Sequence, residues 1–419
     1  MKVKVITLLG LIALASARKS PNADYVKELL QSQPALRVST DIEADSQLDV
    51  PGLIRRYGYP QETHRVTTAD GYILELHRIP TGRDNFNEPG PRPVAFLMHG
   101  LLSSSADFLV LGPGTALGYA LAEAGYDVWL GNARGNYYSR NHRTMNPDSI
   151  LNQNFWEFSW DQIGNYDLPA FVDYILTVTR QEKLHYIGHS QGGTTFLVLN
   201  SLRPEYSEKF ISFQGLAPAS FFDNNDFSVF NGLAPFENVI ENMAFTTRNA
   251  EIFGDRAFAQ WFYSTLCTNT IFEGVCNFGI GQILGQSVNT TMLPLLLAHA
   301  PAGASIRQVA HYGQVIRFRA FRRYNYNALR NLAVYGRISP PEYDLSNVKV
   351  PTYLHYGEND REVNFRDIYT LAGKLPNTVG LFKVGRDTFN HYDFIWASDA
   401  KELLFPKLLA CMKNAENML

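Results

Sequence analysis

The 419-residue sequence has few cysteines, no excess of charge of one sign and no long apolar run beyond its first residues. Three cysteines occur, at 267, 276 and 411, without a C-x-x-C pair or a His/Cys cluster, so we expect no metal ion. The 37 Lys and Arg residues nearly balance the 40 Asp and Glu residues, which argues against a nucleic-acid partner.

The apolar run at the amino terminus has the pattern of a secretory signal peptide. Residues 1–17, MKVKVITLLGLIALASA, place two lysines before an apolar stretch that ends in small residues. Cleavage before Arg18 would change the formal charge from −3 to −5. The next longest run, TMLPLLLAHAPAGA, is interrupted by prolines and too short to span a bilayer, and the polar end CMKNAENML is no lipid-anchor signal. We therefore expect a soluble mature protein without a transmembrane segment.

The cysteines and one glycosylation motif suit a secretory route, which permits disulfide formation. Cys267 and Cys276 enclose a short loop and form the natural pair. Cys411 lies in an expected carboxy-terminal helix and is left as a buried thiol. The N-x-S/T motif at Asn289 predicts a glycosylation site if it lies on the surface.

Strand-like apolar runs alternate with helical stretches along most of the chain. This βαβα order predicts an α/β fold with a mainly parallel central sheet and helices on both faces. Residues 62–80 predict a hairpin around the turn 69–71. Helices are expected near 115–124 and from about 164 to 179. The series of strands stops near residue 219 and resumes near 348.

The segment between these two series differs in character. Its apolar and aromatic residues recur at helical intervals without β-rich runs, which predicts a helical cap inserted into the core. A second independent domain is the alternative. The expected organisation is a signal peptide at 1–17, a pro-like or linker segment at 18–45, the first part of the core at 46–219, the helical cap with a lid at 220–339 and the second part of the core at 340–419.

One motif carries the chemistry of this fold. In HYIGHSQGGTTF, residues 185–196, a serine stands between two glycines, after a predicted strand at 184–187 and before a predicted helix at 191–199. Such a serine is either a small residue in a tight turn or a nucleophile raised above the sheet on a sharp elbow. Ser190 is a nucleophile only if a base and an acid accompany it.

Both partners are expected at the ends of later strands, in the order acid and then histidine. Glu358 and Asp360 follow the strand TYLHYG, and His391 follows the strand VGLFKVG. We assign the acid to Asp360, because Glu358 comes so soon after its strand that it belongs in the turn. His391 is assigned as the base, because no other histidine follows Asp360. An imidazole oriented by a carboxylate can take the serine proton.

The negative charge that develops on the substrate oxygen needs preorganised donors. One is expected from the residue after the nucleophile, Gln191, and the other from the loop after an early strand, at Leu101 in FLMHGLLSSS. His99 in that loop is assigned a structural role, because the position of the base is already filled.

Together these blocks resemble the acid lipases of the gastric and lysosomal type. The resemblance runs from about residue 50 to 405 through GYPQETHRVTTADGYILELHRIP, MHGLL, FSWDQIGNYDLPAFVDYIL, YIGHSQGGT, PPEYDLSNVKVPTYLHYGENDREV and FNHYDFIWA. It implies an α/β-hydrolase core, a helical cap with a lid, and hydrolysis of neutral-lipid esters without a cofactor. It also implies the same five residue roles and a cap disulfide at the first two cysteines.

We therefore expect a secreted or lysosomal lipase that acts on triacylglycerols or sterol esters at an oil–water interface. Two alternatives stay open: a carboxylesterase for small soluble esters, and a non-catalytic lipid carrier of the yolk type on the same scaffold. The many aromatic residues between 220 and 262 predict a lid that opens at a lipid surface. A rigid cap core is the competing interpretation.

Overall fold

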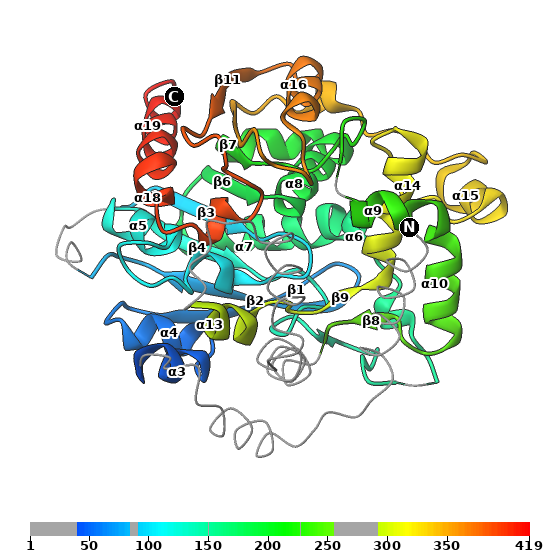
Figure 1. Ribbon diagram of the computed structural model, residues 1–419, viewed down its shortest axis with the longest axis horizontal. Helices are drawn as coiled ribbons and strands as arrows, with labels where there is room; N and C mark the ends of the chain where they lie inside the picture. Colours follow the sequence, from blue (N-terminus) through cyan, green and yellow to red (C-terminus); the bar gives the residue numbers. More distant parts are fainter. Residues whose placement is uncertain (1–39, 84–90, 150, 227, 255–291) are drawn as a thin grey trace.

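The computed structural model describes residues 40–83, 91–149, 151–226, 228–254 and 292–419. One nine-stranded sheet forms its centre, in the order β1-β2-β4-β3-β6-β7-β10-β11, with β5 paired to β2 (Figure 1). The strands are β1 (Glu62–Thr67), β2 (Tyr72–Ile79), β3 (Val94–Met98), β4 (Asp127–Gly131), β5 (Asn141–His142), β6 (Leu184–His189), β7 (Phe210–Leu216), β10 (Thr352–Tyr356) and β11 (Thr378–Lys383).

The inner strands are buried along their whole length, as strands covered on both faces must be. Every residue of β3, β4, β6, β7 and β10 is buried, whereas burial alternates along the edge strand β11. All neighbours from β4 to β11 pair in parallel, while β1 and β2 are antiparallel to their partners. The predicted α/β fold with a mainly parallel sheet is confirmed.

The predicted hairpin at 62–80 is present as β1 and β2. Their register pairs Glu62 with Arg78 and Thr67 with Ile73, so the turn falls between residues 67 and 72. Gly71 lies in this turn with a φ of 97°, a conformation that residues with a Cβ rarely adopt.

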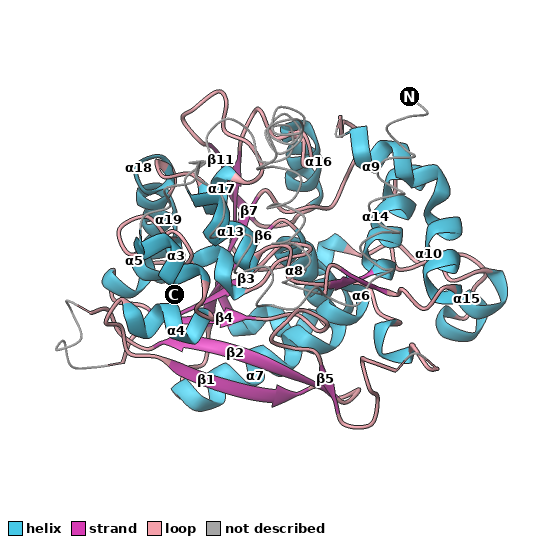
Figure 2. Ribbon diagram, turned by 60° about the horizontal axis from the view of Figure 1, so that its bottom comes forward, coloured by secondary structure: helices cyan, strands magenta, loops and turns pink. Residues whose placement is uncertain are grey.

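Helices cover both faces of the sheet. In Figure 2, α5, α18 and α19 lie on one side of the central strands, and α8 and α16 lie on the other. The helices of the core are α4 (Val50–Arg56), α5 (Leu117–Glu123), α6 (Trp160–Gln162), α7 (Leu168–Thr179), α8 (Gln191–Leu202), α16 (Phe365–Lys374), α17 (Asp393–Trp396), α18 (Ala400–Leu403) and α19 (Phe405–Glu416).

The helix expected from about residue 164 begins earlier than the sequence pattern indicated. It starts at α6, where Ser159 and Gln162 form a capping box, and continues through a π-helical turn at 163–167 into α7. The capping box satisfies backbone donors at the helix start. The Ser-x-x-Gln pattern in the sequence is the signal that predicts a helix start at this point.

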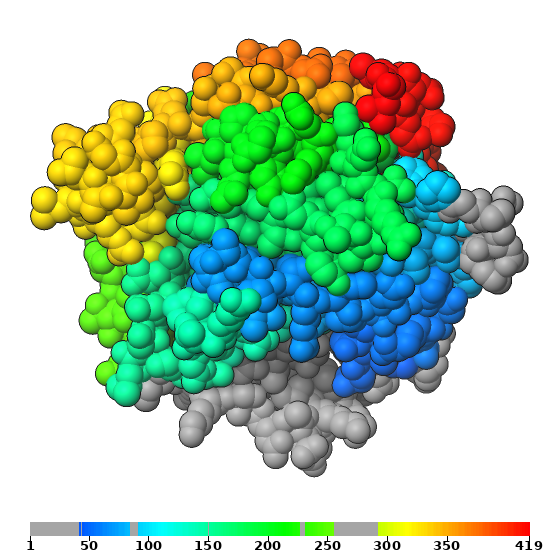
Figure 3. All heavy atoms as spheres, turned by 180° about the vertical axis from the view of Figure 1, so that it is seen from behind, coloured from blue at the N-terminus to red at the C-terminus, as the bar shows by residue number. Residues whose placement is uncertain are grey.

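The described parts of the segment 220–339 are mostly helical. They contain α9 (Ser228–Leu233), α10 (Glu237–Thr246), α13 (Leu293–His299), α14 (Ile306–Phe318) and α15 (Ala328–Tyr335). Helices α9 and α10 contact α14. From behind, the part of the surface that contains α14 and α15 projects at one side of the molecule (Figure 3).

Two details of this region differ from expectation. A short antiparallel pair, β8 (Glu251–Ile252) and β9 (Ala304–Ser305), lies in the segment expected to lack strands. Helix α13 packs on α3 (Thr40–Ser46), so the end of the expected linker at 18–45 is helical and contacts the segment 220–339. Apolar periodicity within one segment cannot reveal a partner so distant in the chain.

The helices in the described ranges are short. The longest single α-helix, α14, has 13 residues, and the continuous run of α6, the π-helical turn and α7 covers 160–179. Within those ranges, no helix has both the length and the apolar character needed to cross a membrane.

Candidate active site

Ser190 stands at a sharp turn between strand β6 and helix α8. Its φ of 52° and ψ of −118° lie in a region that residues other than glycine rarely occupy. The Ser190 N–H donates to the carbonyl oxygen of Leu216 at the end of β7, over 3.0 Å. The strand, turn and helix expected around this serine are therefore present, and the turn is held against the neighbouring strand.

A chain of hydrogen bonds leads from Ser190 to two residues far away in the sequence. The Oγ of Ser190 lies 2.8 Å from Nε2 of His391, and Nδ1 of His391 lies 2.8 Å from Oδ2 of Asp360. All three residues are buried. Burial opposes a charge on His391, but the carboxylates of Asp360 and Glu362 outweigh it and raise the pKa of the imidazole above its ordinary value.

The alternative acid, Glu358, lies elsewhere. Its carboxylate is exposed and contacts Nζ of Lys383 at 2.6 Å. Asp360, by contrast, is buried and accepts hydrogen bonds on its other oxygen from the N–H groups of Glu362 and Val363, at 3.0 and 2.7 Å. The structure thus brings Asp360, and not Glu358, to the histidine.

Both expected oxyanion donors belong to segments that adjoin the serine. Gln191 is the first residue of α8, where a backbone N–H has no acceptor within its own helix. Leu101 belongs to the loop after β3, which passes close to the serine. A Cβ placed on the adjacent Gly100 would lie 3.3 Å from the Cβ of Ser190.

Comparisons with known proteins show which family the chain belongs to. The family model of the alpha/beta hydrolase fold matches residues 93–398, and that of the partial alpha/beta-hydrolase lipase region matches residues 50–112. Lipase 1 of Drosophila melanogaster is 41% identical, over 88% of this chain and 80% of its own. Bovine gastric triacylglycerol lipase is 37% identical, over 88% of this chain and 92% of its own.

A third relative, human lysosomal acid lipase/cholesteryl ester hydrolase, is 33% identical over 90% of this chain and 93% of its own. The chain belongs to the gastric and lysosomal lipase family. A solved bacterial membrane phospholipase A matches all of this chain and all of its own with a TM-score of 0.50 and 15% identity, which supports the fold of this lipase.

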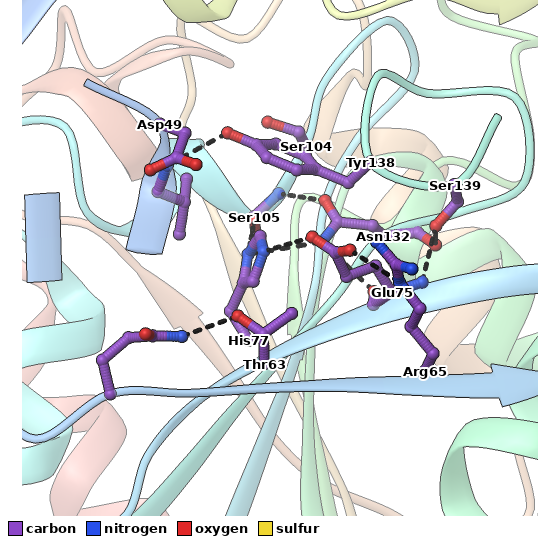
Figure 4. A network of polar contacts seen from close by, with 12 residues as sticks. Asp49, Thr63, Arg65, Glu75, His77, Ser104, Ser105, Asn132, Tyr138 and Ser139 are labelled. Carbon is purple, nitrogen blue, oxygen red and sulfur yellow. Dashed lines mark hydrogen bonds and ion pairs between the residues drawn. The ribbon is translucent and has the colours of Figure 1, made fainter. Parts of the chain in front are cut away.

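A buried polar network supports the loop after β3 of the lipase (Figure 4). Nδ1 of His77 lies 2.8 Å from Oγ of Ser105, and Nε2 of His77 lies 3.0 Å from a carboxylate oxygen of Glu75. The Ser105 N–H donates to Asn132. These are the residue types of a catalytic triad, but His77 and Ser105 have no exposed surface, so a substrate cannot reach them.

His99 belongs to the same support, as the sequence predicted. Its Nε2 accepts the N–H of Ala133 at 3.1 Å, and its Nδ1–H donates to the carbonyl oxygen of Gly100 at 2.8 Å. Burial lowers the pKa of His99 to about 4, so the ring is neutral at pH 7. A neutral ring that both accepts and donates holds the loop beside Leu101.

Two further supports were not found from the sequence. His189 donates from Nε2 to the carbonyl oxygen of His391 at 2.9 Å and so positions that backbone. The side chain of Gln191 donates to Gln308 at 2.8 Å, which ties the elbow to α14. His189 precedes the nucleophile directly, which is a usable signal, whereas nothing in the sequence pairs Gln191 with Gln308.

Three of the expected sites, Cys267, Cys276 and Asn289, lie outside the described residues. Cys411 is a free, buried residue of α19, as expected, and burial raises the pKa of its thiol to about 11. Within the described ranges, no group of three or more His, Cys, Asp or Glu side chains could hold a metal ion.

Proposed function

We propose that this protein is a secreted or lysosomal lipase that hydrolyses triacylglycerols or sterol esters through an acyl-serine intermediate. The hydrogen-bonded chain from Ser190 through His391 to Asp360, set on an elbow, is the observation that carries the proposal. The names of the relatives, which include a gastric triacylglycerol lipase and a lysosomal cholesteryl ester hydrolase, support neutral lipid as the substrate class.

In the first half-reaction, Oγ of Ser190 attacks the ester carbonyl carbon and its proton passes to Nε2 of His391. The N–H groups of Leu101 and Gln191 stabilise the oxyanion of the tetrahedral intermediate. Asp360 stabilises the imidazolium. His391 then returns the proton to the departing alkoxide, and the acyl group remains on the serine.

In the second half-reaction, water replaces the alcohol. It attacks the acyl carbon and gives its proton to His391, which passes it to Ser190 as the fatty acid departs. The chemistry needs only residues of this chain and one water molecule.

The decisive variant is Ser190→Ala, which removes only the attacking oxygen. We expect hydrolysis to fall by several orders of magnitude, while folding and lipid binding stay largely intact. The assay compares triolein, cholesteryl oleate and a short-chain soluble ester over a range of pH from about 4 to 8. Retained turnover in the variant would remove the serine from the mechanism. A wild-type protein that binds lipid without hydrolysing it would favour the carrier.

An apolar stripe on the cap favours a lipid surface over a soluble ester. Phe236, Val239 and Met243 are spaced along one side of the region of α10, and their exposed fractions are 50%, 63% and 46%. At an oil interface these side chains can face lipid instead of water, at a gain of about 25 cal/mol for each Å² of apolar surface removed from water. This stripe is distinct from the buried Phe221 and Phe222.

Kinetics on a partly soluble ester test this contact. If the cap binds or opens at the interface, the rate should rise steeply once the substrate exceeds its solubility limit. Replacing Val239 and Met243 by serine should flatten the rise without changing the rate on monomeric ester. A hyperbolic curve with no break at the limit would favour the carboxylesterase alternative.

The remaining assignments extend the same proposal. Residues 46–219 and 340–419 form the core, and 220–339 form a cap with a lid. In the secretory pathway, Cys267 and Cys276 are bonded and Asn289 carries a glycan. Peptide mapping under non-reducing conditions tests the bond, and a mass shift on deglycosylation tests the glycan. A disulfide from Cys411 to either partner would overturn the pairing.

A further inference from the structure

His391 faces a second carboxylate that the proposed mechanism does not use. Asp360 lies at Nδ1 of the ring, and Oε2 of Glu362 lies 3.5 Å from Nε2, the nitrogen that also faces Ser190. Glu362 is buried, with 7% of its surface exposed. Each nitrogen of one imidazole therefore has its own carboxylate.

The turn after β10 produces this arrangement. Oδ1 of Asp360 accepts the N–H groups of Glu362 and Val363, which fixes the backbone over these residues. The carboxylates of Asp360 and Glu362, two residues apart, thereby reach the two sides of the His391 ring. A D-x-E pattern alone does not show this, because side-chain placement depends on the turn.

Among the described residues that act on Glu362, His391 is the one that can carry a positive charge. In the described part of the chain, the titratable side chains that act on Glu362 are His391, Asp360 and Tyr392, and Tyr312 faces it from α14. Burial raises the pKa of Glu362 to about 7, while the charge of His391 opposes the rise. The carboxyl therefore changes its charge close to neutral pH, next to the nitrogen that must accept the serine proton.

We propose that Glu362 is a positioning residue that sets the lower pH limit of hydrolysis, because its carboxylate stabilises the imidazolium of His391. This inference rests on the proposed function, in which neutral His391 is the base. An ionised Glu362 favours the protonated ring and offers Nε2–H an acceptor other than Ser190. Without that charge, the ring loses its proton at lower pH and can act as the base there.

The test compares Glu362→Gln with Glu358→Gln. Both changes remove one negative charge from the same turn, but Glu358 is exposed and paired with Lys383. The measurement is the pH profile of kcat/KM on a soluble ester, together with the rate at which a fluorophosphonate labels the serine. In Glu362→Gln the acid limb of both profiles should move down by about 1 pH unit or more. In Glu358→Gln it should move by less than about 0.3, because solvent screens an exposed charge.

Further variants keep the outcome decisive. Glu362→Asp keeps the negative charge but shortens the side chain by one methylene, which moves the carboxylate away from His391. Its acid limb should therefore lie between those of the wild type and Glu362→Gln. If folded Glu362→Gln keeps the acid limb of the wild type while Ser190→Ala is inactive, the role of Glu362 is refuted and the proposed function stands. If Ser190→Ala stays active, the proposed function itself fails.

Discussion

The tight approach of helix α8 to strand β3 makes Gly192 the most demanding position of the elbow. A Cβ on Gly192 would lie 2.7 Å from the carbonyl carbon of Met98, closer still to its oxygen, and 3.0 Å from the carbonyl oxygen of His99. These are backbone atoms at the end of β3 and in the loop that follows it, so no side chain can rotate away to relieve the contact. Gly192→Ala must therefore push α8 and this loop apart.

The size of the effect follows from that displacement. Overpacking of this kind costs about 1–3 kcal/mol, and the better helix propensity of alanine returns at most about 1 kcal/mol. We expect a net loss of about 1–2 kcal/mol in the free energy of unfolding. Because the loop beside Leu101 moves by about 1 Å relative to the serine, kcat should fall by about 10²-fold.

Urea unfolding and the kcat on a soluble ester measure the two effects. Gly373→Ala in α16 is the matched control, because a Cβ there meets no atom within 4 Å. This control should gain about 0.5–1 kcal/mol and keep its activity. If Gly192→Ala proved as stable and as active as the wild type, the close packing of α8 on the end of β3 would be wrong.

Two further predictions concern charged groups. Asp360→Asn should lower kcat by about 10³- to 10⁴-fold, because the amide cannot stabilise the imidazolium. Glu358→Gln should leave kcat near its original value. If Glu358→Gln lowered kcat more than Asp360→Asn, Glu358 would be the acid. A hydrogen bond with His185 lowers the pKa of Glu416 to about 2, so this carboxylate stabilises the fold above pH about 4.5 and loses that contribution as the pH falls toward 2. The gap in unfolding free energy between the wild type and Glu416→Gln should accordingly narrow between about pH 4.5 and 2 in urea titrations, and a gap that stays constant would contradict the assignment.

Much of the fold could be predicted from local patterns. The inner strands of a parallel sheet are continuous apolar runs because both of their faces are covered. Small residues between a predicted strand and a predicted helix indicate the elbow. The order of serine, acid and histidine follows from where such strands end. The start of α6 depends on the capping box of Ser159 and Gln162, which apolar periodicity does not reveal.

The tertiary structure decided which side chains meet. Glu358 and Asp360 are two residues apart after the same strand, and only the turn sends one to Lys383 and the other to His391. The same turn directs the carboxylate of Glu362 toward Nε2 of His391.

The hydrogen bonds that hold the loop after β3 and the elbow likewise could not be predicted from sequence patterns. His77 and Ser105 are 28 positions apart, and Gln191 and Gln308 are 117 apart. Sequence by itself determined which residues can be strands, helices and a nucleophile, because those properties depend on neighbours along the chain. Only the folded chain determined their partners, because a hydrogen bond between distant residues depends on how whole strands and helices pack.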